Sequence, residues 1–173
     1  MTGLGSNLRI IQKIPAERAR DLAWYLGAVL IPVAVFTFVL ATAWVSGSSM
    51  LPGLSDGDFI VCLRHAAAGY GDVVLLRDDS NRVLVKRVEG LPGDEIQISG
   101  GVLYRNGIAV DEAYLFDGSY AGDDFDALTV PDGKIFVLGD NRNASMDSRS
   151  DKLGCVARED LIGKMLFRLG GGS

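Results

Sequence analysis

The chain has 173 residues, enough for one modest domain with additional segments but not for two full domains. Hydrophobic residues make up 48% of it and the net charge is −5, but residues 1–21 hold four basic and two acidic groups whereas residues 46–173 hold 13 and 20. An acidic domain without a basic stripe argues against a nucleic-acid-binding protein.

Residues 22–45 contain no charged side chain, and this apolar run predicts a transmembrane helix. At about 1.5 Å per residue the helix would measure about 36 Å, enough to cross a bilayer with some tilt. Basic residues beside a first span tend to stay in the cytoplasm. We therefore expect residues 1–21 to form a cytoplasmic tail and the remaining domain to lie outside the plasma membrane.

A cleavable signal peptide is the alternative interpretation of this segment, because Ala41-Thr42-Ala43 resembles a small-residue cleavage site. The apolar run before that site is about 20 residues long, beyond the usual 7–15 of a signal peptide. The length favours a retained anchor.

Beyond residue 46 the sequence is typical of a mostly β protein. Short β-branched and apolar runs alternate with Gly, Asp, Asn and Pro turn residues, which predicts a coiled antiparallel sheet or barrel-like domain over residues 46–169. The expected strands are residues 58–63, 72–76, 82–88, 96–99, 102–105, 108–110 and 134–138. Residues 111–127 are expected to form a long surface loop and 170–173 a disordered tail, while residues 158–167 fit either a short helix or a closing strand.

Lys86 lies inside the apolar stretch of residues 83–88. If this stretch is a strand, Leu84, Lys86 and Val88 share one face. Burial of that face would lower the lysine pKa, which suits a general base. A solvated edge strand carrying a lysine is the alternative that the pattern alone favours.

Ser49 lies only four residues beyond the apolar run, in Gly47-Ser48-Ser49-Met50-Leu51-Pro52. Gly, Ser and Pro also cluster in ordinary turns. The position is the informative feature, because four extended residues span at most about 14 Å and keep the hydroxyl near the membrane surface.

Residues 139–149 form a dense polar segment after the last expected strand. It contains two carboxylates, Asp140 and Asp147, and two guanidinium groups, Arg142 and Arg149. Such a run can be a capped turn or an ion-pair network that fixes a loop.

Together these segments resemble the type I signal peptidases (leader peptidases), a family of Ser–Lys serine proteases. The family's boxes correspond here to Ser49-Met50-Leu51-Pro52, Gly71-Asp72-Val73-Val74, residues 86–94 and residues 139–149. Their order agrees, and the resemblance covers roughly residues 22–169. It implies a β catalytic domain with a variable insertion at about residues 95–134.

The resemblance also implies roles for individual side chains. Ser49 would be the nucleophile, Lys86 the general base, and Ser145 would hydrogen-bond and orient the lysine amine. Met50 would pack beside the substrate channel. The charged residues of the last box would hold it in place, with Asp147–Arg149 or Asp140–Arg149 as ion pairs and Arg142 as a further member.

The oxyanion hole is where the chain differs within the family pattern. Some members carry a serine two positions before the nucleophile, where this chain has Gly47. The N–H of Ser49 is then the expected donor, with Ser48 as a further candidate.

The resemblance predicts removal of signal peptides from preproteins with small residues before the cut, in contact with the lipid bilayer and without a metal or other cofactor. A specialised relative that processes one secretion or conjugation substrate is one alternative. An inactive membrane-anchored β-domain that serves as a binding module is another. Cys62 and Cys155 could form a disulfide or be two buried apolar side chains, and the single histidine, His65, leaves no usual zinc constellation.

Overall fold

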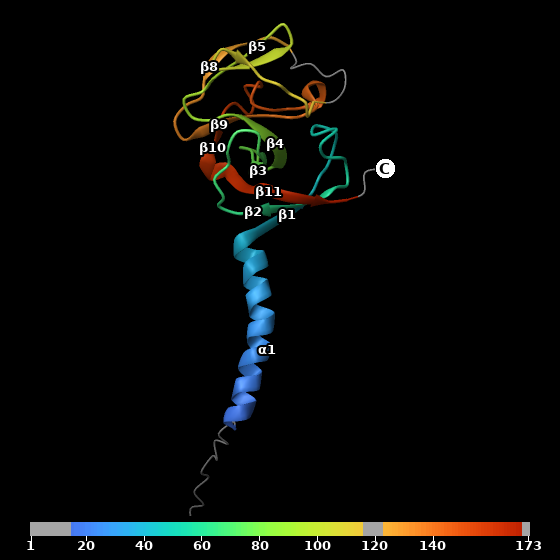
Figure 1. The fold of residues 1–173 in the computed structure, drawn as a ribbon, viewed down its shortest axis with the longest axis vertical. Coiled ribbons are helices and arrows are strands. Elements are labelled where there is room, and N and C mark those ends of the chain that lie inside the picture. Colours follow the sequence, from blue (N-terminus) through green and yellow to red (C-terminus); the bar gives the residue numbers. More distant parts are fainter. Residues whose placement is uncertain (1–14, 116–122, 171–173) are drawn as a thin grey trace, which may run out of the picture.

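The computed structural model describes residues 15–115 and 123–170, which form a helical stalk and a β-domain (Figure 1). Helix α1 (Ala16–Ala34) continues into the π-helical segment η1 (Val35–Val39) and projects away from the domain. The 23 residues Glu17–Val39 are long and apolar enough to cross a membrane, and their most apolar stretch is not buried against the domain.

The expected helix over residues 22–45 is wrong at both ends. α1 already includes the charged residues after Ala16, which a search for uncharged runs passes over. Residues 40–44 are not helical but form strand β1 (Leu40–Trp44). Ala41 and Val45 are 3% and 5% exposed in the domain core, so the apolar character of these two residues reflects packing within the domain rather than contact with lipid.

Strand β1 also bears on the alternative of a cleaved signal peptide. Ala41-Thr42-Ala43 lies inside β1 and pairs with residues 60–62 of strand β2 (Phe59–Leu63). A cut after Ala43 would detach most of this strand from the sheet.

Two antiparallel sheets make up the domain. The larger one contains, in spatial order, β1, β2, β11 (Leu161–Leu169), β3 (Val73–Arg77), β4 (Val83–Gly90), β9 (Lys134–Leu138) and β10 (Val156–Ala157). The smaller one contains β7 (Ile108–Ala109), β6 (Val102–Arg105), β5 (Glu95–Ser99) and β8 (Phe125–Thr129). Two short 3₁₀ turns, η2 (Arg142–Ala144) and η3 (Arg158–Asp160), complete the described elements. Figure 1 shows β1 and β2 next to α1, with β5 and β8 at the far end of the domain.

The two sheets meet where β4 ends. A side chain at Gly90 would lie 2.9 Å from Ile96 and from Val130, so only glycine lets the strand pass this closely. Phe136 and Leu138 of β9 share a fully buried cluster with Ile96 and neighbouring apolar residues of the smaller sheet. The smaller sheet therefore packs on the larger one and is not a separate unit.

The predicted mostly β fold with an N-terminal apolar helix is confirmed. All seven expected strands are present, with β1, β8 and β10 in addition. Residues 158–167 contain η3 and most of β11, which settles the alternative in favour of a closing strand. Of the expected surface loop, residues 125–127 belong to β8 and residues 116–122 lie outside the described ranges. Residues 1–14 of the expected tail 1–21 and residues 171–173 of the expected tail 170–173 also lie outside these ranges.

Candidate active site

Ser49 lies in the turn after β1, and its neighbour Met50 anchors this turn in the core. Met50 is 1% exposed, and its carbonyl accepts a hydrogen bond of 2.8 Å from the Leu54 N–H. The Ser49 carbonyl accepts a 3.0 Å hydrogen bond from the Asn141 N–H, which joins the turn to the last box. Ser49 itself is half-buried, and within the described residues its own N–H makes no hydrogen bond.

Lys86 comes from the middle of β4, where it pairs with Val74 of β3. Its side chain is buried, with the residue 3% exposed, and Nζ lies 2.8 Å from Ser49 Oγ in a hydrogen bond. Burial lowers the pKa of Lys86, and the carboxylates of Asp147 and Asp140 oppose this shift in part. The two residues singled out from the sequence are thus brought into direct contact.

A cleft of about 310 Å³ runs from this pair toward the end of the helical stalk. One wall is residues 41–46 and the other is residues 83–86, with Met50 and Arg64 also lining it. Both walls are strands with a free edge, because β1 is the last strand of its sheet and β4 pairs with β9 only from Arg87 onward. The cleft can therefore accept an extended peptide through main-chain hydrogen bonds.

Ser145 is near the pair but does not have its expected partner. Its hydroxyl is buried and makes no hydrogen bond within the described residues, so the expected bond to the Lys86 amine is wrong for this structure. Lys86 Nζ makes its hydrogen bond to Ser49 Oγ instead, and the Ser145 hydroxyl is left without a partner among the described residues. A side chain at Gly139 would overlap both Ser145 and the Ser49 carbonyl, so this glycine allows the last box to lie against the nucleophile turn.

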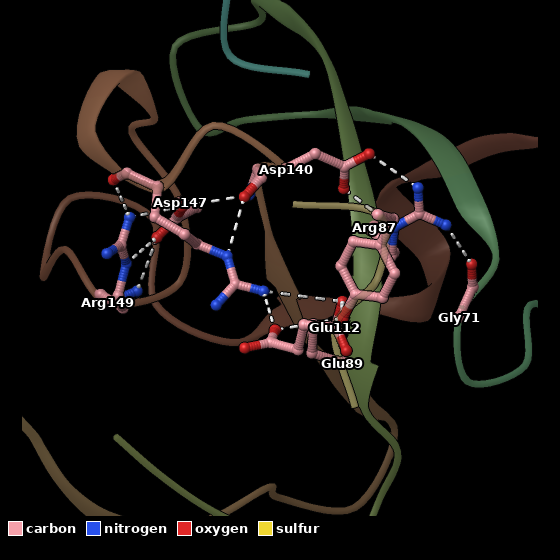
Figure 2. A network of polar contacts seen from close by, with 10 residues as sticks. Gly71, Arg87, Glu89, Glu112, Asp140, Asp147 and Arg149 are labelled. Carbon is pink, nitrogen blue, oxygen red and sulfur yellow. Dashed lines mark hydrogen bonds and ion pairs between the residues drawn. The ribbon is translucent and has the colours of Figure 1, made fainter. Parts of the chain in front are cut away.

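The ion pairs of the last box differ in part from expectation. Arg149 pairs with Asp147 at 2.8 Å, as one of the two expected pairs. Asp140 does not pair with Arg149 but accepts two hydrogen bonds, of 2.8 and 2.7 Å, from the guanidinium of Arg87 (Figure 2). Arg87 follows Lys86 in β4, so this pair fastens the last box directly to the lysine strand.

Arg142 belongs to a second buried cluster that the sequence analysis missed. Its side chain is fully buried and bonds Glu112 Oε1 through Nη2, with Glu89 Oε1 4.0 Å away. The Tyr114 hydroxyl lies 2.7 Å from Glu89 Oε1 and 3.1 Å from Glu112 Oε1. The Tyr114 ring also stacks on the guanidinium of Arg87 at 4.3 Å. Figure 2 shows Glu89 and Glu112 next to each other beside the strand that carries Arg87.

Glu89 is the second ionisable side chain buried in β4 and is fully shielded from solvent. Burial raises its pKa from 4.5 to about 7, against the hydrogen bond from Tyr114 and the charge of Arg142. The signal that drew attention to Lys86, an ionisable residue within an apolar strand, would also have identified Glu89. Glu112 and Tyr114 lie in the expected surface loop, where nothing in the sequence distinguishes them.

The remaining candidates contribute little to the geometry. Ser48 is exposed and does not line the cleft. Cys62 is buried and Cys155 is half-buried, and both are free thiols in different apolar clusters, with burial raising the pKa of Cys62 to about 11. Over residues 15–115 and 123–170, no three His, Cys, Asp or Glu side chains are arranged to bind a metal.

Comparison with known proteins identifies the family. The family described as signal peptidase, peptidase S26, matches residues 18–169. The chain belongs to this family. A Signal peptidase I of Bacillus caldolyticus is 36% identical over 88% of this chain and 91% of its own length, and Signal peptidase I S of Bacillus subtilis is 37% identical over 81% and 82%. A solved signal peptidase I from Enterococcus faecalis matches with a TM-score of 0.52 and 31% identity, over 57% of this chain and 97% of that structure.

Family membership confirms the resemblance drawn from the four boxes, and the chain is a serine peptidase of the signal peptidase I type. Its apolar N-terminal helix is consistent with a membrane anchor.

Proposed function

We propose that this signal peptidase cleaves preproteins with Ser49 as nucleophile and Lys86 as general base. The observation that carries the proposal is the 2.8 Å contact between Ser49 Oγ and the buried Lys86 Nζ. A buried lysine with a lowered pKa is neutral more often near physiological pH and can accept the hydroxyl proton. Oγ then attacks the scissile carbonyl, and Lys86 returns the proton to the leaving amine. A water molecule deprotonated by Lys86 releases the acyl-enzyme.

The developing oxyanion needs a hydrogen-bond donor close to the nucleophile. The Ser49 N–H has no partner within the described part of the chain, which supports it as this donor. Ser48 is exposed outside the cleft and receives no support as a second donor, and Gly47 has no side chain to offer one.

The substrate would lie in the cleft as an added strand between β1 and the first half of β4. Their free edges supply the main-chain partners, and Val85 and Ile162 line the cleft with apolar groups. We propose that small side chains before the cut fit these shallow walls.

The proposed setting is the outer face of the plasma membrane, with α1 as a single span and its N-terminus in the cytoplasm. The basic residues before α1 support this orientation. At the stalk end of the domain Trp44, Phe167 and Leu169 are 72%, 49% and 56% exposed. Aromatic and apolar side chains at this level favour contact with the bilayer interface.

Replacement of the nucleophile tests the proposal. Ser49→Ala should abolish cleavage of a membrane-embedded preprotein while the protein still folds, because only Oγ and its hydrogen bond with Lys86 are removed. An acylating β-lactam-type inhibitor should add its mass to the peptide containing Ser49 in the wild type and not in the variant. Near-normal turnover by Ser49→Ala would overturn the proposed role, and a labelled residue other than Ser49 would identify a different nucleophile.

A further inference from the structure

Arg64 follows β2 and closes the end of the helical stalk. Its N–H donates to the Val39 carbonyl at 2.8 Å, and its Nε donates to the Leu40 carbonyl at 2.8 Å. Helices end with carbonyl groups that lack partners, so Arg64 satisfies two such groups where the chain changes from helix to strand.

The outer part of the Arg64 side chain is not used in this way. Within the described residues its terminal nitrogens make no hydrogen bond or ion pair, and the residue is half-buried in the wall of the cleft. Ser49 and Lys86 lie in the wall of the same cleft. β4 runs from Val83 to Lys86 along it, about 10 Å at about 3.3 Å per residue.

A signal peptide must reach this cleft from the bilayer. Its apolar segment of about 7–15 residues has to be helical in lipid, since no other partner exists there for its backbone groups. That helix ends in unpartnered carbonyls with a partial negative charge. The peptide must then become extended to lie between β1 and β4, at the level where the enzyme's own chain makes the same change.

We infer that Arg64 is a specificity-determining residue that donates its terminal N–H groups to the last carbonyls of the signal peptide's apolar helix. The inference rests on the proposed function and adds a length requirement to it, namely the number of residues between the apolar helix of the signal peptide and the cleavage site. With the helix end held at Arg64 and the scissile bond at Ser49, the length of the cleft limits the number of extended residues between them, and the β4 stretch that lines it can pair with about four.

The experiment uses full-length enzyme in vesicles of neutral lipid, with preproteins that differ only in the number of residues between the apolar segment and the cut. A short peptide containing the cut but no apolar segment is the second substrate. Arg64→Met should lower kcat/KM on the preferred preprotein about tenfold more than on the short peptide, as expected for loss of hydrogen bonds from a charged donor. Its dependence on spacer length should also be flatter than that of the wild type.

The kcat/KM of Arg64→Lys on the preferred preprotein should lie between those of the wild type and Arg64→Met. An ammonium group can still donate a hydrogen bond but lacks the paired N–H groups of a guanidinium. Arg77→Met is the matched control, because Arg77 is an exposed arginine whose guanidinium, among the described residues, bonds only Asn81. It should retain the wild-type spacer profile. An equal loss of kcat/KM on the preprotein and on the short peptide in Arg64→Met would overturn the inference. Arg64 would then serve only to hydrogen-bond the end of the enzyme's own helix.

An unchanged spacer profile would also overturn the inference, as would an effect of Arg64→Met seen only with anionic lipid, which would assign Arg64 to a headgroup phosphate. The proposed function is judged separately, by whether wild-type enzyme cleaves both substrates and loses this activity in Ser49→Ala.

Discussion

Two ionisable side chains of β4, Lys86 and Glu89, are both buried but in different surroundings. Lys86 lines the substrate cleft, whereas Glu89 belongs to a buried polar cluster. Lys86 faces the cleft, with its amine on Ser49 and one side open to substrate. Glu89 is fully buried in a cluster with Tyr114, Glu112 and Arg142. The contacts show the separation, because Glu89 shares its partner Tyr114 with Arg87, the residue next to Lys86 in the strand, and neighbouring strand residues project from opposite faces.

Burial acts on both groups by disfavouring the charged form. It lowers the pKa of Lys86 and raises the pKa of Glu89 to about 7. At Lys86 the neutral form is the one that catalysis needs. At Glu89 the neutral form balances a cluster in which one buried guanidinium faces two carboxylates. The same physical effect therefore prepares a base on one face of β4 and a neutral structural acid on the other.

Removing the amine should have the largest effect. Lys86→Met should lower kcat about 10³-fold or more, in the upper part of the range for loss of a general base. In the wild type, activity should fall as the pH drops below the lowered pKa of Lys86, because the ammonium cannot accept the Ser49 proton. Single-turnover cleavage measured across the acid range checks both expectations.

The stability of Lys86→Met supplies the control for this prediction. The native pKa of Lys86 is lowered from 10.5, so between the two values the unfolded state binds the proton and the native state does not. Wild-type stability should therefore rise with pH across this window, and Lys86→Met should lack the rise. A flat activity profile in the wild type, or a large loss of fold in the variant, would contradict the role of a buried base.

The sequence was most informative for residues that belong to motifs in a fixed order along the chain and whose chemical type the reaction or an ion pair requires. Ser49, Lys86 and the Asp147–Arg149 pair were predicted, and the first two form the contact at the centre of the cleft. The end of the helix was not predicted, because an apolar run does not distinguish lipid from a buried strand. Within residues 40–44, Ala41 and Ala43 are apolar for the second reason, since they pack in the domain core.

Partners that come from distant segments were also beyond the sequence. Asp140 could pair with any nearby arginine, and only the fold places Arg87 closer than Arg149. Glu112 and Tyr114 reach the buried cluster from a segment with no strand pattern of its own. Ser145 is the reverse case. The motif correctly predicts that it lies near the Ser49–Lys86 pair, but its expected hydrogen bond is not made.

Neutralising Glu89 should have an intermediate effect, which appears as a change in how the stability of the protein depends on pH. The native pKa is about 7 and the unfolded value is 4.5, so between them the native state holds a proton that the unfolded state has released. Wild-type stability should decrease as the pH rises from 4.5 through 7. Glu89→Gln should lack this decrease and be more stable than the wild type at pH 8, by at most about 3.5 kcal/mol at about 1.4 kcal/mol per pKa unit.

Urea unfolding at pH 5 and pH 8 measures the effect, and Glu112→Gln is the matched control. Glu112 is the carboxylate bonded to Arg142, so its neutralisation should destabilise the protein at pH 8. If Glu89→Gln were destabilised at pH 8 in the same way, Glu89 would be an ionised partner of Arg142 and the contrast with Lys86 would fail.

Removing one hydroxyl from the cluster should have the smallest effect. Tyr114→Phe keeps the ring on Arg87 but loses the 2.7 Å hydrogen bond to Glu89, at a net cost of about 1 kcal/mol. That bond favours ionised Glu89, so its loss should raise the pKa of Glu89 further and move the stability decrease to higher pH. Tyr104→Phe, in which a half-buried hydroxyl without a hydrogen-bond partner among the described residues is removed, should leave the midpoint unchanged. If the pH midpoint of the stability decrease moved to lower pH in Tyr114→Phe, the hydrogen bond would stabilise neutral Glu89. Glu89 would then donate this hydrogen bond to Tyr114 rather than accept it.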